Sequence, residues 1–327
     1  MNSSPNMQGS SSYYGLCNQS DAVPIVAIVM CTYNGAKYLS EQLDSIIQQT
    51  HARWKLFISD DGSTDATMAI VAEYQDRYPD RIVALKGPQK GVAWNFWSLL
   101  GNKEISADFY AFCDQDDTWL PEKLQHGLSA IRSYGDLPAL YCSRTKLVTA
   151  TGATQGMSPL FRKRPGFKNA LVQNIAGGNT MLVNHAAICR ARSYQLHPAD
   201  LVMHDWTLYL LVTASGGVAI YDSKPQVLYR QHGRNIIGSR SGLKSKMARL
   251  IGMIQGRQAQ WYSLNCEALL KNEGLLSPEA RRTLLDFEEL RNARGLKAVK
   301  LLLSSGLYRQ TLSGNITLLL AAWCGKL

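Results

Sequence analysis

The sequence predicts an α/β fold, in which a mostly parallel sheet carries helices on both of its faces. The main observation is that apolar runs of strand length alternate, through the first half of the chain, with segments whose apolar residues recur at helical spacing. Such alternation implies right-handed crossovers between parallel strands. A second observation is that polar clusters directly follow three of these strands. Because ligands bind at the carboxyl ends of the strands in such sheets, the same pattern predicts where a site lies.

Four strands are expected in the first half of the chain, each a short run of apolar, β-branched or aromatic residues. They are residues 25–30, 54–59, 81–85 and 109–113. The last run, Phe109 to Cys113, has the length and composition of a buried strand.

A helix is expected after each strand. The first begins beyond the turn at Asn34-Gly35, and Ser63 to Asp65 supplies capping side chains for the second. The third spans Gly91 to Leu100, and Pro121 is placed to begin the fourth. The apolar positions of the first two helices are Leu39, Leu43, Ile46, Ile47, Met68, Ile70, Val71 and Tyr74.

Length and composition are those of a soluble globular protein. The chain has 327 residues, of which 46% are hydrophobic and 18% charged, and no apolar stretch approaches the roughly 20 residues that span a bilayer. Residues 1–22 are expected to form a disordered leader, because they are rich in Ser, Asn and Gln and lack the features of a secretory signal. Seven scattered cysteines indicate reduced thiols and a cytoplasmic location.

The net charge of +10 is concentrated at the C-terminal end. Residues 240–327 contain fourteen Lys or Arg and six Asp or Glu, a net charge of +8, and helical periodicity dominates from Leu243 onward. One interpretation of residues 241–327 is a basic, amphipathic appendage that rests on the anionic inner leaflet of a membrane. The alternative is a set of helices that pack on the rest of the chain and leave a basic face in water. No nucleic-acid-binding motif accompanies the charge, so nucleic acid is not an expected partner.

Three carboxylates, Asp114, Asp116 and Asp117, directly follow the fourth strand. Clustered carboxylates repel one another and are costly to desolvate, and a divalent cation removes that cost. A solvated acidic turn is the alternative. Two other polar clusters, Thr32 to Asn34 and Asp60 to Asp65, follow the first and second strands. All three should therefore meet at one edge of the sheet, which favours a ligand site over a solvated turn.

Several motifs resemble those of a known family. Cys31-Thr-Tyr-Asn-Gly35, Ser59-Asp-Asp-Gly-Ser-Thr-Asp65 and Asp114-Gln-Asp-Asp-Thr-Trp-Leu-Pro-Glu-Lys-Leu124 resemble the family 2 glycosyltransferases of the GT-A fold, over about residues 24–240. Gly177 to Met181, His204 to Trp206 and Tyr229 to Gly238 resemble the bacterial rhamnosyltransferase branch, whose members build lipopolysaccharide core, O-antigen or other surface glycans. The resemblance implies a catalytic domain over residues 23–240, with a nucleotide-binding half over 23–120 and an acceptor half over 121–240.

The resemblance implies an inverting, metal-dependent transfer of a sugar from a nucleotide donor to a glycan or glycolipid acceptor. The expected donor is dTDP-L-rhamnose and the expected metal Mg²⁺ or Mn²⁺. UDP-N-acetylglucosamine or UDP-galactose as donor, or a catalytically silent nucleotide-sugar-binding module, are the alternatives. A location at the cytoplasmic face of the inner membrane would bring such an enzyme to a lipid-linked acceptor.

The resemblance also implies the donor-binding residues. Tyr33 is expected to stack on the base and Asp60 to accept the N3–H of a pyrimidine. Asp116 is the expected metal ligand, Asp114 reaches the ribose or the metal, and Asp117 assists or caps the next turn. The full set expected to bind the donor or the metal is Thr32, Tyr33, Asn34, Asp60, Asp61, Asn95, Asp114, Asp116, His232 and Arg234.

Asp205 is the expected catalytic base, because the resemblance places the family's base at this position. Its alternative role is simple capping of the apolar helix that it opens. Gly178, Asn179, His204 and Trp206 are expected around the acceptor. Trp206 is a potential sugar platform, although an aromatic residue beside helical apolar positions can equally belong to the core.

Overall fold

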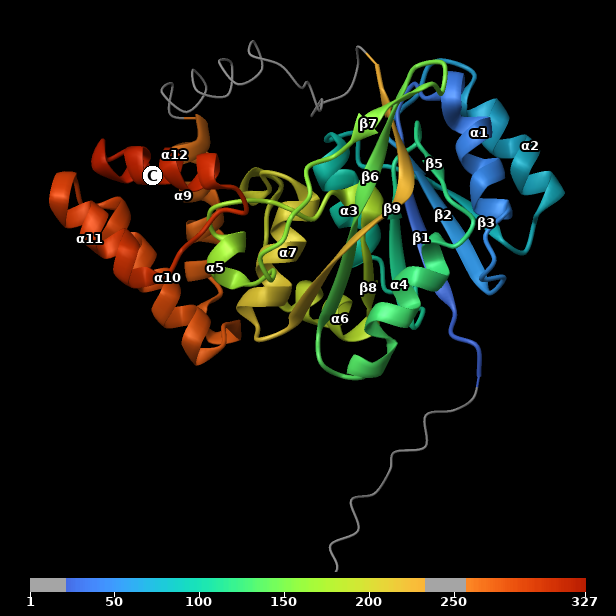
Figure 1. Ribbon diagram of the computed structural model, residues 1–327. Helices are drawn as coiled ribbons and strands as arrows, with labels where there is room; N and C mark the ends of the chain where they lie inside the picture. Colours follow the sequence, from blue (N-terminus) through green and yellow to red (C-terminus); the bar gives the residue numbers. More distant parts are fainter. Residues whose placement is uncertain (1–21, 233–256) are drawn as a thin grey trace, which may run out of the picture.

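A single mixed sheet organises the molecule (Figure 1). The computed structural model describes residues 22–232 and 257–327. Within them, the strand order is β3-β2-β1-β4-β8-β6-β9-β5, and β7 pairs with β6. The strands are β1 Val26–Thr32, β2 Trp54–Asp60, β3 Ile82–Lys86, β4 Phe109–Cys113, β5 Thr118–Trp119, β6 Ala139–Thr149, β7 Thr154–Met157, β8 Leu182–Asn184 and β9 Val218–Gln231.

The first four strands are parallel, and they lie where the apolar runs predicted them. Every residue of β1 and β4 is buried, which accounts for the unbroken apolar character of both runs. Beyond β4 the sheet is mixed, because β8 and β5 run antiparallel to their neighbours while β6 and β9 form a long parallel pair. The carboxyl ends of β1, β2 and β4 remain side by side at one edge.

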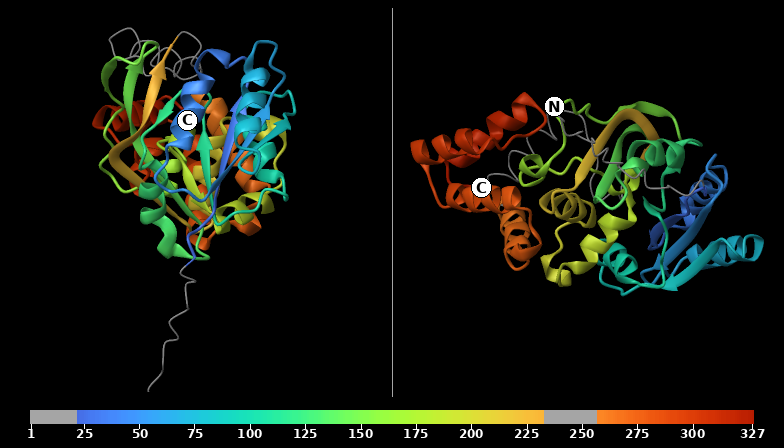
Figure 2. Two further views of the ribbon diagram at one scale, coloured as in Figure 1. Left: turned by 90° about the vertical axis from the view of Figure 1, so that its right-hand side faces the viewer. Right: turned by 90° about the horizontal axis from the view of Figure 1, so that it is seen from below.

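Helices cover both faces of the sheet, as predicted (Figures 1 and 2). On one face α1 Ala36–Ile47, α2 Thr67–Arg77 and α4 Lys123–Ile131 enclose one apolar core. On the other face α3 Val92–Gly101, α6 His185–Ser193 and α7 His204–Ala214 enclose a second, larger core. Short helices complete the connections: α5 Phe167–Ala170, η1 Arg132–Tyr134, η2 Gly178–Thr180, η3 Pro198–Asp200 and η4 Glu273–Leu275.

The C-terminal helices pack outside α7 and extend the larger core, so the predicted helical C-terminal region is confirmed. They are α9 Arg257–Leu270, α10 Pro278–Arg291, α11 Gly295–Ser305 and α12 Leu312–Trp323. All eleven residues of α7 are buried, because this helix has the sheet side on one flank and the C-terminal helices on the other. Residues 1–21 of the predicted leader, which was expected over 1–22, and the boundary near residue 240 lie outside the described residues.

The start of α2 differs in detail from the expectation. Ala66 occupies the position before the helix and makes no side-chain cap. Asp65, one residue earlier, accepts a hydrogen bond from the backbone N–H of Thr67 at 3.0 Å. Asp65, which belongs to the predicted capping segment Ser63 to Asp65, therefore supplies the cap from the residue before Ala66. Among the described residues, no helix combines the length and apolar character that crossing a membrane requires.

Candidate active site

The loops after β1 and β2 are fastened to each other by their polar side chains. Thr32 Oγ1 donates to Asp60 Oδ1 at 2.8 Å, and Asn34 Oδ1 accepts from the backbone N–H of Thr64 at 2.8 Å. Asn34 has φ 47°, a left-handed conformation that Asn tolerates better than most residues. Tyr33, between them, leaves 58% of its surface exposed. The two loops thus form one rigid unit that presents an aromatic ring to solvent.

The Asp60 carboxylate is saturated by its own loop. Besides Thr32, it accepts from the Ser63 hydroxyl at 2.5 Å and from the backbone N–H groups of Gly62 and Ser63 at 3.1 and 2.8 Å. An ionised carboxylate has about four acceptor sites, so these four donors use its capacity in this conformation. A base N–H must therefore displace one of them. The predicted contact from Asp60 to the base stays a prediction.

Asp61 and Asn95 hold the segment between β3 and α3. The Asp61 carboxylate accepts from the backbone N–H groups of Gln89 and Gly91, at 2.6 and 2.9 Å. The Asn95 amide accepts from Ser59 Oγ at 2.6 Å and donates to Ser59 O at 3.0 Å, and the residue is 1% exposed. Asn95 corrects the sequence prediction, because it fastens α3 to β2 and has no surface to offer a nucleotide.

The three carboxylates after β4 form a compact cluster, as predicted. One ligand atom from each of Asp114, Asp116 and Asp117 lies within 4.8 Å of the other two. Burial, followed by repulsion from Asp117 and Asp116, raises the pKa of Asp114 well above its usual range. Burial and the neighbouring Asp116 raise the pKa of Asp117 to about 7. Carboxylate oxygens that repel one another in this way are suited to binding a divalent cation.

Asp117 is the most firmly held of the three. It is fully buried and accepts from Asn179 Nδ2 at 2.5 Å and from the backbone N–H of Arg230 at 3.1 Å. Asn179 was expected beside the acceptor, and the structure places its amide on this carboxylate instead. Asp117 therefore links the cluster to η2 and to β9.

The end of β9 reaches the cluster from the other side. His232 Nε2 lies 2.7 Å from Asp116 Oδ2, and its ring stacks on Tyr38 with a centroid distance of 5.3 Å. Arg230 pairs with Glu41 on α1 at 2.6 Å. The structure thus brings together Asp116 and His232, both of which belong to the set expected to bind the donor or the metal. Arg234 lies outside the described residues.

Gln115 was missed by sequence reasoning. Its side-chain amide pairs with both backbone groups of Tyr33: Oε1 accepts from the N–H at 2.9 Å, and Nε2 donates to the carbonyl at 3.1 Å. The alternation of an extended segment could have indicated that Gln115 points away from Asp114 and Asp116. This residue joins the carboxylate loop to the loop that presents the Tyr33 ring.

Lys123 is a second residue that the sequence did not single out. It is 2% exposed, and its Nζ lies 3.6 Å from the centroid of the Trp119 ring. Burial lowers the pKa of Lys123 to about 7, against the opposing effect of Asp117 and Asp114. A buried lysine beneath the carboxylates partly offsets their repulsion. Trp119 is also 2% exposed and belongs to the core.

Asp205 lies at the N-terminal end of α7, facing the same site. Oδ2 of its carboxylate accepts from the backbone N–H of Gly178 at 3.1 Å, and Oδ1 accepts from that of Trp206 at 2.7 Å. Its negative charge contributes to the raised pKa of Asp114, which places the two carboxylates in one electrostatic environment. The positive end of the helix dipole favours the ionised form at this position.

All four residues expected around the acceptor, Gly178, Asn179, His204 and Trp206, are buried. Trp206 is 2% exposed, donates from Nε1 to Ala170 O at 2.7 Å and packs edge-on against Trp261. It is a core residue, which corrects the prediction of a sugar platform. His204 is 8% exposed, and its ring stacks on Phe96 with a centroid distance of 4.1 Å. The predicted place of His204 beside the acceptor stays a prediction.

Gly178 lies directly in front of His204. A Cβ atom at this position would lie 2.5 Å from His204 Nε2, so only glycine fits here without displacement. The absence of a side chain lets the Gly178 backbone approach both His204 and the Asp205 carboxylate.

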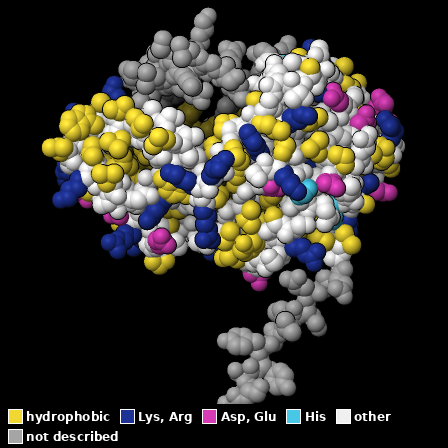
Figure 3. Space-filling view, viewed as in Figure 1, with side chains coloured by type: hydrophobic (Ala, Val, Ile, Leu, Met, Phe, Trp, Pro, Cys, Tyr) yellow, Lys and Arg dark blue, Asp and Glu magenta, His cyan; other side chains and the backbone are white. Residues whose placement is uncertain are grey.

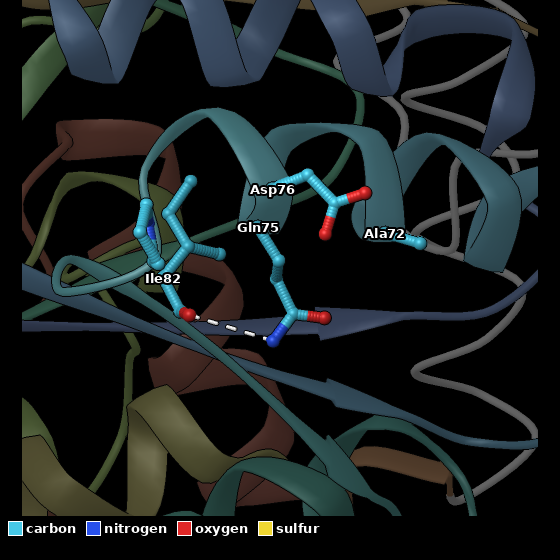
Figure 4. Close-up of a pocket in the computed structure, with 5 residues that line it drawn as sticks. Ala72, Gln75, Asp76 and Ile82 are labelled. Carbon is cyan, nitrogen blue, oxygen red and sulfur yellow. Dashed lines mark hydrogen bonds between the residues drawn. The ribbon is translucent and has the colours of Figure 1, made fainter.

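Two hollows adjoin the nucleotide-side elements. One, of about 280 Å³, lies beside Asp60 and is lined by Gly62, Met68, Ala84, Leu85, Lys86 and Gln89 as well. The other, of about 410 Å³, lies between α2 and the start of β3, where Gln75 Nε2 donates to Ile82 O at 3.4 Å (Figure 4). The second hollow is at the opposite end of β3 from the carboxylate cluster. Only the first adjoins the candidate site.

Comparisons with known proteins agree with this geometry. A family model described as Glycosyl transferase family 2 matches residues 27–195. The dTDP-rhamnosyl transferase RfbG of Shigella flexneri is 30% identical over 246 residues, which are 71% of this chain and 80% of that protein.

Solved structures share the fold at low sequence identity. The TarS 1–349 structure from S. aureus in complex with UDP has a TM-score of 0.55 at 16% identity, covering 82% of this chain and 71% of that one. The mannosyltransferase PcManGT from Pyrobaculum calidifontis, in complex with GDP-Man and Mn²⁺, has a TM-score of 0.51 at 17% identity, covering 92% and 86%. At this identity the likeness concerns the fold alone.

Replacement of Gly178 by alanine tests the close approach of η2 to α7. The added methyl group must displace the His204 ring or η2, and Gly178→Ala is expected to lower the free energy of unfolding by about 1–3 kcal/mol. Denaturant unfolding measures this. Gly177→Ala is the matched control, because a Cβ there meets its nearest atom at 3.3 Å and should be tolerated far better. An equal loss of unfolding free energy in the two variants would show that the contact with His204 does not account for the effect of Gly178→Ala.

Proposed function

The chain belongs to glycosyl transferase family 2, and on that basis we propose that it transfers L-rhamnose from dTDP-L-rhamnose, with inversion, to a glycan acceptor of the bacterial cell surface. That the chain is a glycosyltransferase follows from the family. The choice of donor is supported by the similarity to a dTDP-rhamnosyl transferase along most of that protein's length.

One observation carries the proposed chemistry. Adjacent residues of η2 hold the carboxylate cluster and the lone carboxylate Asp205: Asn179 donates to Asp117 and the backbone N–H of Gly178 donates to Asp205, although 88 residues separate Asp117 from Asp205 in the chain. An inverting transfer needs a group that stabilises the departing diphosphate and a base for the incoming hydroxyl. The two sets of carboxylates supply both.

We assign donor binding to the rigid unit formed by the loops after β1 and β2. The exposed Tyr33 ring offers a stacking surface for a base, and the hollow beside Asp60 has room for part of a nucleoside. The apolar side chains of Met68 and Leu85 line this hollow. Gln115 keeps the Tyr33 loop at a fixed position relative to the carboxylates, and hence the base relative to the diphosphate.

We assign divalent metal binding to Asp116, Asp114 and His232. The short contact between Asp116 and His232 supports a shared role at one point, and the raised pKa of Asp114 supports a cation there. Bound Mg²⁺ or Mn²⁺ would neutralise the charge that develops on the leaving diphosphate. Asp117 orients the cluster through Asn179 and Arg230.

We assign the role of catalytic base to Asp205. Two backbone N–H groups fix its carboxylate, and an ionised carboxylate has about four acceptor sites, so capacity remains for an acceptor hydroxyl. The rigid backbone of Gly178 would then border the acceptor sugar. The proton passes from the hydroxyl to Asp205 as the new glycosidic bond forms at the anomeric carbon. We place the reaction at the cytoplasmic face of the inner membrane, with a glycan or glycolipid acceptor.

A thermal-shift panel of dTDP, UDP and GDP, each with and without Mn²⁺, tests the proposed donor. A ligand at 100 times its Kd stabilises the folded chain by about 2.7 kcal/mol, so the competent nucleotide raises the melting temperature most. We expect the largest metal-dependent rise with dTDP. A rise with UDP alone would assign another donor, such as UDP-N-acetylglucosamine or UDP-galactose, and a rise with GDP alone would also contradict dTDP-L-rhamnose. No rise with any nucleotide would contradict nucleotide binding at this site altogether.

Asp205→Asn tests the base. The variant is expected to keep its metal-dependent shift with dTDP and to lose about 10²–10⁴-fold in turnover, because general base catalysis contributes about that much. Release of dTDP from dTDP-L-rhamnose, with bacterial membranes as the source of acceptor, measures turnover. Asp200→Asn is the matched control, because Asp200 is as buried as Asp205 but pairs with Lys271 away from the cluster. Near-normal turnover of Asp205→Asn would place the base elsewhere.

A further inference from the structure

The last two helices expose an unusual amount of apolar surface. Among the described residues, seven of the fifteen exposed large apolar side chains belong to α11 and α12. They are Leu296, Leu303, Leu312, Ile316, Leu319, Leu320 and Trp323. Hydrophobic side chains gather over the upper left of the space-filling view, where these helices lie (Figures 1 and 3). Soluble monomers rarely expose a contiguous apolar patch of this kind without a function.

The pattern along α12 is that of a helix with two apolar faces. Residues 312, 316, 319, 320 and 323 recur at helical spacing and form one exposed stripe, with exposed fractions from 37% to 79%. The opposite face, with Leu318, Ala321 and Ala322, is buried against the rest of the protein. Packing on the protein explains the second face and leaves the first without a role inside the described residues.

Charge decides which partner fits the exposed stripe. Residues 295–327 contain four basic residues and no acidic residue. Lys297 and Lys300 lie on exposed positions of α11, between Leu296 and Leu303, and the side chain of Lys297 also reaches Glu289 on α10 at 3.4 Å. Exposed apolar residues flanked by lysines match the boundary between the acyl chains and the headgroups of an anionic bilayer.

The surface is held rigidly on the catalytic scaffold. Arg309, in the connection between α11 and α12, donates from Nη2 to the Tyr262 hydroxyl at 2.6 Å and from Nε to Val172 O at 3.2 Å. The Thr311 side chain caps the start of α12 by accepting from the backbone N–H of Gly314 at 3.0 Å. The stripe is therefore preformed, and docking it requires no folding step.

We propose that α11 and α12 dock the protein on an anionic lipid surface, with the stripe of α12 lying in the plane of the interface. A helix of twelve residues is too short to span a bilayer, so it lies along the surface. In Figure 1, α12 is on the upper side of the molecule, where β9 also ends. Docking would bring the protein to a lipid-linked acceptor, and that benefit rests on the proposed function. The docking itself does not depend on the proposed function.

Flotation of the full chain with lipid vesicles tests the proposal. Vesicles of phosphatidylcholine with phosphatidylglycerol are expected to carry the protein upward, and phosphatidylcholine alone to carry much less. The double variant Ile316→Glu with Leu320→Glu is expected to lose at least about tenfold in binding, because two charges enter the apolar boundary. Val23→Glu with Leu137→Glu is the matched control, since both side chains are exposed apolar residues outside the C-terminal helices, and it should bind as the wild type does.

Two further measurements separate lipid from other partners. Lys297→Gln with Lys300→Gln is expected to weaken binding to anionic vesicles by about fivefold for each lysine, and added salt to weaken it further. Wild-type binding by the Ile316/Leu320 variant would overturn the proposal. So would a wild-type dimer that this variant converts to a monomer, because the stripe would then face a second copy. The flotation assay contains no nucleotide. A failure to bind vesicles therefore does not contradict the proposed donor, and a failure of the thermal-shift panel does not contradict the docking.

Discussion

The mutual repulsion of buried and half-buried carboxylates is the interaction on which the rest of the site depends. Asp114, Asp116 and Asp117 stand together at the end of β4, and Asp205 adds its charge from α7. In the folded chain the pKa of Asp117 rises from 3.8 to about 7, so the folded state binds more protons than the unfolded state between those values. The stability that this group contributes is therefore present below about pH 4 and is lost as pH rises through about 7.

The scaffold holds these charges together by surrounding them with fixed donors. Asn179 and the backbone of Arg230 hold Asp117, while Gly178 holds Asp205, so η2 and β9 each contact the acidic residues directly. Lys123 lies near Asp117 and Asp114, whose charges oppose the lowering of its pKa by burial. The two contacts of Asp117, with Asn179 and with Arg230, join the proposed donor half to the proposed acceptor half.

Much of the nucleotide side could be predicted from the sequence, because its signals are local. Apolar runs and turn residues located β1 to β4. Parallel strands place their carboxyl ends at one edge, regardless of how the rest of the sheet is arranged. The second half of the sheet could not be predicted, because β6, β8 and β9 pair across long separations in the chain. Trp206 was misassigned for a similar reason: its nearness to Asp205 in sequence does not reveal that α7 is buried on all sides.

The affinity for Mn²⁺ as a function of pH tests the central claim most directly. A cation held by Asp114 and Asp116 lies beside Asp117, so its charge favours loss of the proton that Asp117, at a pKa of about 7, retains in the folded chain. Calorimetric titration is therefore expected to show affinity rising by about tenfold from about pH 6 to about pH 8, with proton release on binding. An affinity that does not change over this range, or no binding at all, would contradict the account.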